Sequence, residues 1–283
     1  MKDIIISQTN TRALGDLSSR FYTIVPHSFG RMVPPVINSI DMLQKKMEML
    51  EMLSDIDLAL GLEKKEAEDD EVLPHPIDQH YDSLHCKLSL VDRGSEEFKV
   101  VQQYLTATQE DRKMQLQEIW KVDREGEAAR FSAHEDIKER KLLWHGTNVA
   151  VVAAILKTGL RIMPHSGGRV GKGIYFASEH SKSACYVRGV TEEGKSVAIM
   201  FLAEVALGKE HHITMDDWRL TQPPKGYDSI VAKGTGEPDP SKDKTIKIEG
   251  RDIVVPQGKR ISQPQFSGSR FDKVCAHWAE IVA

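Results

Sequence analysis

Residues 142–186 constrain the fold of this chain more than any other segment, because they place a cluster of glycines between two short apolar runs. Four of the seven residues in 167–173 (GGRVGKG) are glycines. Glycine destabilises regular structure unless a positive φ or a close approach to the backbone requires it. The segment therefore predicts a loop whose backbone something approaches closely, as at a small-molecule pocket.

The loop itself fits neither of two common nucleotide-binding patterns. A Walker A loop would need a glycine in place of Ser166 and a Ser or Thr in place of Gly173. A Rossmann fingerprint is excluded because no GxGxxG opens a helix directly after a strand. Two interpretations stay open: a surface loop without a ligand, or a loop whose Arg169 and Lys172 meet a pyrophosphate.

Polar and aromatic residues flank the loop on both sides. Taken alone, His145 is more simply a core histidine at a strand end, but Gly146 after it leaves the backbone open to a planar carboxamide. Tyr175 and Tyr186 are either core aromatics or two walls around a flat ligand. In the second case Ser183 offers a hydroxyl to the same ligand.

Composition excludes several classes of protein. With 283 residues, 40% of them hydrophobic, the chain can form one or two domains. A net charge of −4 disfavours nonspecific binding to nucleic acid. Cys86, Cys185 and Cys275 form no CxxC pair, which predicts neither a disulfide framework nor a zinc site. No apolar run approaches the ~20 residues of a membrane span, and we expect no membrane partner.

The N-terminal part differs from the rest in its pattern. Apolar residues recur every three or four positions in 40–60, which predicts an amphipathic helix capped by Asn38 or Ser39. We expect the preceding FYTIVPHSFGRMVPP (21–35) to form a loop. This helix needs a partner for its apolar face, so residues 1–62 are interpreted as the end of a helical domain whose first helices are absent. The charge run that follows is interpreted as a solvated linker.

Downstream, strands and helices are mixed without regular alternation, which predicts an α+β domain dominated by antiparallel strands. We expect strands at 84–90, 118–122, 142–146, 174–177, 197–207 and 227–234, helices opened by Ser95 and Ser178 and over 148–159, and a hairpin turning at 249–252.

Five segments together resemble the catalytic domain of the poly(ADP-ribose) polymerases, which has a diphtheria-toxin-like fold. They are HGT (145–147), GLRI (159–162), GKGIYFA (171–177), SKSACY (181–186) and FLAEVALG (201–208). The resemblance covers about residues 14–271 and is strongest to the third of the family's DNA-break-dependent nuclear members. It implies a mostly antiparallel split β-sheet ADP-ribosyltransferase domain over 74–283, incomplete at its C-terminus. A partial helical regulatory domain (1–62) and a charged linker (63–73) would precede it.

The resemblance also implies a reaction and its participants. NAD⁺ would be the substrate, without a metal, and ADP-ribose would pass to acceptor proteins, including the chain itself, with release of nicotinamide. The implied setting is the nucleus and DNA repair, with DNA breaks sensed only through domains missing from this chain. Mono- and poly-ADP-ribosylation both stay open.

The resemblance assigns a role to each matching residue. The Gly146 backbone and the Ser183 hydroxyl would hold the nicotinamide carboxamide, and Tyr186 and Tyr175 would stack on either side of the ring. His145 would form a hydrogen bond with a hydroxyl of the adenosine ribose. The remaining assignments place Lys182 near the nicotinamide ribose, and Arg161 and Thr147 near the adenosine half. Of these residues, His145, Tyr175 and Lys182 would be catalytic.

The chain departs from the family after Phe271. A glutamate in a strand reading roughly S-E-Y-[IL]-[IV]-Y should follow, but the chain reads DKVCAHWAEIVA, without the motif or the leucine-rich closing strand. Glu280 is the only glutamate there, and its offset makes it an unlikely substitute. We expect an alternative C-terminal end, loss of a central or edge strand, and weak or no transfer. The alternative function is therefore an NAD⁺-binding chain that is impaired in catalysis.

Overall fold

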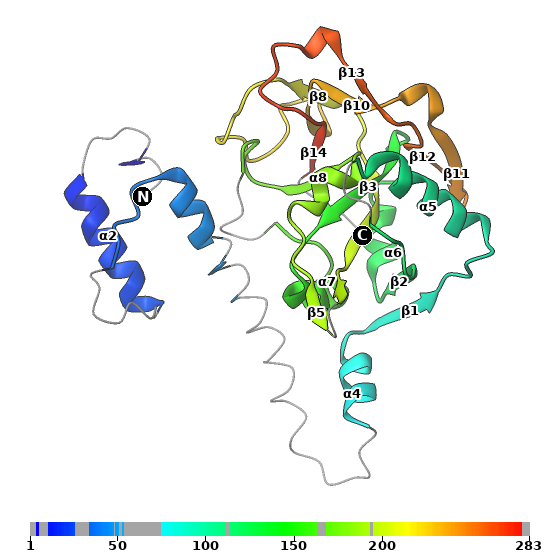
Figure 1. Cartoon of the computed structure of the whole chain (residues 1–283), viewed down its shortest axis with the longest axis horizontal. Coiled ribbons are helices and arrows are strands. Elements are labelled where there is room, and N and C mark those ends of the chain that lie inside the picture. The colour runs from blue at the N-terminus through cyan, green and yellow to red at the C-terminus, as the bar shows by residue number, and fades with distance from the viewer. Residues whose placement is uncertain are drawn as a thin grey trace. The chain divides into compact units, whose positions relative to one another are not determined.

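The computed structural model describes residues 4–5, 11–25, 34–47, 49–50, 53, 75–110, 114–162, 168–192 and 195–278. The chain divides into two compact units, Met1–Ser54 and Asp55–Ala283, and each is described by itself (Figure 1). The expected linker, residues 63–73, lies outside the described residues.

The N-terminal unit contains helix α2 (Thr11–Ile24) and a second helix that begins at residue 40. Ser39 caps the second helix, as predicted, since its Oγ accepts a hydrogen bond from Met42 N at 3.2 Å. The expectation of a loop over 21–35 is wrong for 21–24, which form the last turn of α2. Ser18 of α2 accepts a hydrogen bond from Ile37 N at 2.9 Å, so the segment before the second helix packs on α2.

The larger unit is built on an eight-stranded sheet with the order β11-β12-β3-β4-β14-β9-β8, in which β7 also pairs with β3 (Figure 1). Only β12 with β3 and β8 with β9 pair in parallel, which confirms an α+β fold rich in antiparallel strands. The strands of this sheet are β3 (Arg140–Gly146), β4 (Ile174–Ala177), β7 (Met200–Ala206), β8 (Glu210–Ile213), β9 (Ser229–Ala232), β11 (Lys244–Ile248), β12 (Arg251–Val255) and β14 (Cys275–Trp278).

Three two-stranded sheets and several short helices surround the large sheet. The strand pairs are β1 (Cys86–Leu90) with β2 (Trp120–Arg124), β5 (Val190–Glu192) with β6 (Lys195–Val197), and β10 (Gly236–Pro238) with β13 (Arg260–Ser262). The helices are α4 (Pro76–Ser83), α5 (Glu96–Thr108), α6 (Glu127–Ser132), α7 (Val152–Thr158) and α8 (His180–Ala184), with 3₁₀ turns η1 (Val149–Val151), η2 (Pro240–Lys242) and η3 (Pro264–Phe266).

Most of the element boundaries expected from the sequence are found. Ser95 caps α5, with its Oγ accepting from Phe98 N at 3.1 Å. The helix expected over 148–159 divides into η1 and α7 and ends at Gly159, whose φ is +78°. The hairpin turns at Glu249 and Gly250, with φ of +49° and +83°, the positive values that a two-residue turn requires.

Two expectations need correction. Ser178 does not cap α8: the helix begins after Glu179, no side chain caps it, and Ser178 Oγ is buried without a hydrogen-bond partner. The long apolar run 197–207 is not one strand, because β6 ends at residue 197 and β7 begins at Met200. Apolar periodicity cannot detect this break, since the residues on both sides of it are apolar.

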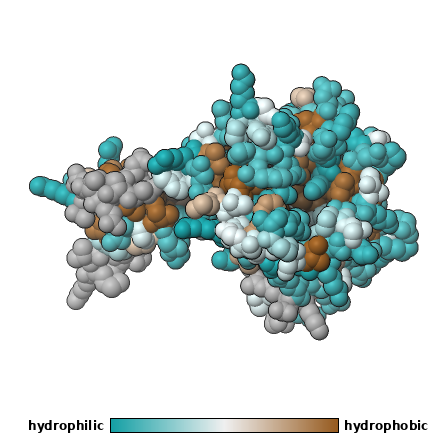
Figure 2. All heavy atoms as spheres, turned by 90° about the horizontal axis from the view of Figure 1, so that it is seen from above, coloured by the Kyte–Doolittle hydropathy of each residue, from teal (hydrophilic) through white to brown (hydrophobic). Residues whose placement is uncertain are grey.

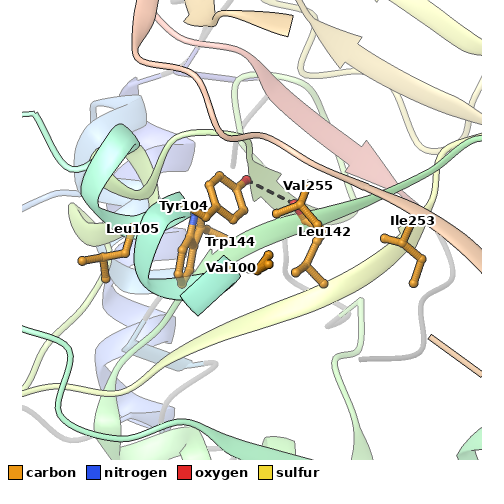
Figure 3. Packing of buried hydrophobic residues seen from close by; sticks show 7 residues of the cluster. All are labelled: Val100, Tyr104, Leu105, Leu142, Trp144, Ile253 and Val255. Atoms are coloured by element: carbon orange, nitrogen blue, oxygen red, sulfur yellow. Dashed lines mark hydrogen bonds between the residues drawn. The ribbon is translucent and has the colours of Figure 1, made fainter. Parts of the chain in front are cut away.

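Helix α5 packs on the large sheet through a buried cluster (Figure 3). Tyr104, with no exposed surface, lies against Trp144 of β3 at a ring-centroid distance of 5.0 Å. Its hydroxyl donates to Leu142 O at 3.1 Å, so the buried polar atom is satisfied. The cluster consists of Val100, Tyr104, Leu105, Leu142, Trp144, Ile253 and Val255. It fixes β3, and the end of β3 carries His145.

The residues after Phe271 form a central strand. β14 pairs antiparallel with both β4 and β9, with His277 opposite Tyr175 and Ile230. Of the central or edge strand that we expect to be lost here, the central position is occupied by β14. DKVCAHW, a sequence unlike the family motif, supplies that strand of the sheet.

Candidate functional site

His145 lies near the end of β3, where its ring contacts the neighbouring strand β4. Its Nδ1 is 2.9 Å from Tyr175 O, and its ring centroid is 5.5 Å from that of Phe176. A carbonyl only accepts hydrogen bonds, so Nδ1 carries the proton and Nε2 is left as an acceptor. Burial lowers the pKa of His145, which favours this neutral form.

Gly146 is the point where β3 and α8 touch. A Cβ added to Gly146 would lie 1.9 Å from Ser183 O, so only glycine permits this contact. At this position the group that approaches the backbone is α8 itself. Ser183 is buried and its Oγ donates to Trp144 O at 2.8 Å. The hydroxyl oxygen can still accept a hydrogen bond from a ligand N–H.

Tyr175 is held by the glycine-rich loop. Its hydroxyl donates to Gly171 O at 2.6 Å and accepts from Val170 N at 3.2 Å. A Cβ on Gly168 would lie 2.8 Å from the Tyr175 hydroxyl, which gives a physical reason for glycine there. Residues 168–171 therefore form a fixed turn over this tyrosine.

Arg169 of the glycine-rich loop has its partners within the protein. Arg169 Nε bonds Asp216 Oδ1 at 2.6 Å and Nη2 donates to Arg270 O at 2.9 Å. Its guanidinium also lies 4.7 Å from the centre of the Phe271 ring. Arg169 therefore ties together three segments, whereas Lys172 is exposed.

The remaining predicted residues differ in their surroundings. Tyr186 follows α8 and exposes 59% of its surface, so of the two expected tyrosine walls one ring is half-buried and the other is exposed. Lys182 Nζ lies 3.9 Å from Asp272 Oδ1. Thr147 is half-buried and its carbonyl accepts from Arg188 N at 3.3 Å. Arg161 lies on the exposed surface beyond α7.

The structure thus brings His145, Gly146 and Tyr175 together at the ends of β3 and β4, and joins Ser183 to them through α8. Glu280 lies outside the described residues. In β14 no residue carries a carboxylate, and Asp272 is the only acidic residue of 272–278.

A groove of about 480 Å³ beside α5 is lined by residues of α5, Arg93 and 114–116, none of them a predicted site residue.

A charged cluster next to α8 was not predicted from the sequence. Glu179, only 1% exposed, lies 3.5 Å from Lys273 Nζ and 3.9 Å from Arg260 Nε. Burial raises the pKa of Glu179, while the two cations act in the opposite direction. The one local signal in the sequence is an acidic residue directly after the apolar IYFAS. Its partners are too distant in the sequence to be inferred from pattern.

The described residues contain no group of three or more His, Cys, Asp or Glu side chains that could hold a metal ion. None of their helices has the length and apolar character needed to cross a bilayer. On the face seen in Figure 2 most of the surface is hydrophilic, and apolar residues gather in a few patches.

Comparison with known proteins identifies the family. Residues 95–274 match the poly(ADP-ribose) polymerase catalytic domain, and residues 1–81 match the poly(ADP-ribose) polymerase regulatory domain. Protein mono-ADP-ribosyltransferase PARP3 of Mus musculus is 54% identical over 93% of this chain and 50% of its own length, and that of Homo sapiens is 53% identical over 93% and 50%. Poly [ADP-ribose] polymerase 1 of Danio rerio is 38% identical over 86% of this chain and 24% of its own length.

The chain therefore spans about half the length of the PARP3 relatives that it matches. Both matched domains agree with the resemblance inferred from the five sequence segments, and the catalytic match covers the strands and the helix that build the site. This chain belongs to the poly(ADP-ribose) polymerase family.

Proposed function

We propose that this chain transfers ADP-ribose from NAD⁺ to protein side chains and releases nicotinamide. The observation that carries the proposal is the junction of β3 and α8, where Gly146 meets the Ser183 carbonyl beside His145. The similarity to relatives named protein mono-ADP-ribosyltransferase PARP3 favours single transfers over chain elongation.

Each site residue has a role in this proposal. The backbone of Gly146 and the hydroxyl of Ser183 bind the nicotinamide carboxamide. Tyr175 and Tyr186 flank the ring, and the acceptor Nε2 of neutral His145 takes an adenosine ribose hydroxyl. These contacts fix the leaving group and the ribose, which lowers the entropic part of the barrier to cleaving the glycosidic bond.

Fewer residues are candidates for binding the adenosine half and the nicotinamide ribose of NAD⁺. We propose that Lys182 lies near the nicotinamide ribose, with Thr147 and Arg161 near the adenosine. Because Arg169 is bonded to Asp216 and to the Arg270 carbonyl, it is left out of this set.

The second candidate is an NAD⁺-binding chain with weak or no transfer. An oxocarbenium-like transition state is stabilised by a nearby carboxylate, and β14 carries none. Loss of a group that acts mainly in the transition state lowers kcat and leaves ground-state binding, at about tenfold in rate for each ~1.4 kcal/mol. We therefore expect this chain to bind NAD⁺ and to turn it over slowly.

Calorimetric titration with nicotinamide and with NAD⁺ tests binding. Ser183→Ala should weaken nicotinamide binding by about 1 kcal/mol, roughly fivefold, because one hydrogen bond is lost. Ser89→Ala, on an exposed position of β1, is the control and should bind as the unchanged chain does. Absence of binding by the unchanged chain rejects both candidate functions.

Labelling with radioactive NAD⁺ separates the two candidates. Binding without self-labelling supports the impaired chain, and strong self-labelling rejects it. Replacing residues 272–283 with the family motif and its closing strand should then restore transfer, because the carboxylate returns to the central strand. A replaced chain that folds and binds NAD⁺ but stays inactive would contradict this explanation.

The domain organisation and cellular setting are proposals as well. We propose that residues 1–62 are part of a helical regulatory domain, 63–73 a solvated linker and 74–283 the transferase domain. The match of 1–81 to the regulatory domain supports the first of these assignments. A nuclear role linked to DNA breaks rests on family membership alone.

A further inference from the structure

Helix α8 is a short element that cannot support itself. It has five residues, His180–Ala184, and no side-chain cap at its start. Isolated helices of this length are unstable in water, so tertiary contacts have to hold it. Two of its residues, Lys182 and Ser183, belong to the proposed site, so whatever holds α8 also sets their position.

Lys273 makes polar contacts at the start of α8, where His180 N also donates to Thr108 Oγ1 at 3.1 Å. Its Nζ lies 2.7 Å from Ser181 Oγ and 3.5 Å from Glu179 Oε2, and it also bonds the Glu110 carboxylate. The Lys273 side chain is only 10% exposed, and that of Glu179 only 1%. A buried carboxylate is costly unless a cation and hydrogen bonds satisfy it, so this lysine stabilises the residue that precedes α8.

The backbone at Asp272 and Lys273 is anchored to the two-stranded sheet of β10 and β13 rather than to α8. Gly236 N donates to Asp272 O at 3.1 Å, and Arg260 Nη2 donates to the same oxygen at 2.6 Å. A Cβ on Gly234 would lie within 2.5 to 2.6 Å of Lys273 backbone atoms, so the two segments are in close contact. The lysine therefore connects a fixed point beside the sheet to the first turn of α8.

The neighbouring Asp272 contacts the same helix. Its Oδ1 lies 3.9 Å from Lys182 Nζ, but its side chain is 65% exposed, so the pair adds little stability. Both contacts come from the segment that directly follows Phe271.

We propose that Lys273 is a positioning residue, which braces α8 through Ser181 and Glu179 and so sets the Ser183 carbonyl against Gly146. This inference rests on the proposed function, because the contact between Ser183 and Gly146 that Lys273 positions is the one assigned to nicotinamide binding. Small displacements of binding groups reduce binding and rate strongly, so release of α8 should weaken the site without unfolding the protein.

Lys273→Met removes the charge and keeps the aliphatic length. Lys233→Met is the matched control, because Lys233 is also buried, at 14% exposure, and pairs with Glu210 at 3.6 Å rather than with α8. Hydrogen exchange of peptides covering 179–186 measures the support of α8 directly. Nicotinamide titration measures its effect on the site, and thermal unfolding reports any general loss of stability.

We expect Lys273→Met to speed exchange in 179–186 by about tenfold or more and to weaken nicotinamide binding about tenfold. Lys233→Met should leave the hydrogen exchange of 179–186 and the nicotinamide affinity unchanged, even where it lowers the melting temperature. Ser181→Ala should act in the same direction as Lys273→Met but more weakly. The effect of the double variant should be smaller than the sum of the two, because both changes remove the contact between Lys273 and Ser181.

The outcomes separate this inference from the proposed function. If Lys273→Met leaves hydrogen exchange in 179–186 unchanged, the inference that Lys273 supports α8 is overturned, whether or not nicotinamide binds. Faster exchange with unchanged nicotinamide affinity reduces Lys273 to a structural residue and also overturns the inference. If the unchanged chain binds neither nicotinamide nor NAD⁺, the proposed function and the positioning role fail together, while the exchange data still decide whether Lys273 supports α8.

Discussion

At the scale of single residues, the chemistry of this site depends on which side-chain atoms already form hydrogen bonds or ion pairs within the protein. His145 donates through Nδ1 to the Tyr175 carbonyl, and Arg169 is held by Asp216. The sequence indicated both residues as candidates, but it could not indicate their partners, which lie 30 and 47 positions away. In the structure His145 therefore has Nε2 as its acceptor atom, whereas the Arg169 guanidinium is bonded to Asp216.

His145 should titrate below the ordinary histidine pKa of 6.5, because burial disfavours the imidazolium. The unfolded chain then binds a proton that the folded chain resists, so the free energy of unfolding should fall as the pH drops below 6.5. NMR titration of the His145 ring measures the pKa. In denaturant titrations, His145→Asn should lack this part of the pH dependence. A measured pKa above 6.5 would contradict the assignment of a neutral ring.

Asp243, which is half-buried, is a second group with a shifted pKa, raised from 3.8 to about 6 chiefly by burial. Glu237 and Asp239 add to the shift and Lys141 opposes it, while Asp243 Oδ1 has no hydrogen-bond partner. Between these two pKa values the folded chain binds a proton that the unfolded chain does not. The carboxyl therefore adds to stability as the pH falls through about 6 toward 3.8, and this contribution is lost as the pH rises.

Asp243→Asn should remove this pH dependence. At about pH 7.5 the variant should be more stable than the unchanged chain, because it no longer buries a charge, and at about pH 5 the difference should shrink. Urea denaturation at the two pH values measures the change. Asp252→Asn, an exposed position in β12, is the control and should show no such trend. A constant difference between Asp243→Asn and the unchanged chain would show that Asp243 is not the titrating group.

At the scale of elements, local patterns in the sequence predicted strands and helix ends well, while long-range packing remained hidden. Ser39 and Ser95 were recognised as helix caps because the relevant contacts lie within three residues. Ser178 was misassigned because a serine before a helical pattern is only a local signal. Glu179 starts α8 instead, supported by Lys273, which lies 94 positions further along the chain.

The contact between β3 and α8 gives a test at this scale. Gly146→Ala should destabilise the chain by about 1–3 kcal/mol, because the new Cβ forces the two backbones apart. Gly268→Ala is the control: no atom lies within 4 Å of its added Cβ, and its stability should stay within about 0.5 kcal/mol. Urea denaturation compares the two variants. Equal stability of Gly146→Ala and Gly268→Ala would contradict the close contact.

At the scale of the whole molecule, the two units differ greatly in the size of their cores. Among the described residues, the unit Met1–Ser54 buries Ile5, Leu14 and Ile37, whereas the larger unit buries the remaining core residues around its eight-stranded sheet. The strand formed after Phe271 could not be anticipated, because its sequence does not match the motif and only its pairing with β4 and β9 reveals it.

This difference in core size predicts two thermal transitions. A unit of 54 residues buries a small share of its surface and is marginally stable by itself, so it should unfold first and with a small enthalpy. Differential scanning calorimetry of the full chain should show this transition below a larger one. The chain 75–283 should show only the larger transition at the same temperature, because its core lies within those residues. A single transition in the full chain, shifted on removal of 1–74, would mean that the two units unfold as one.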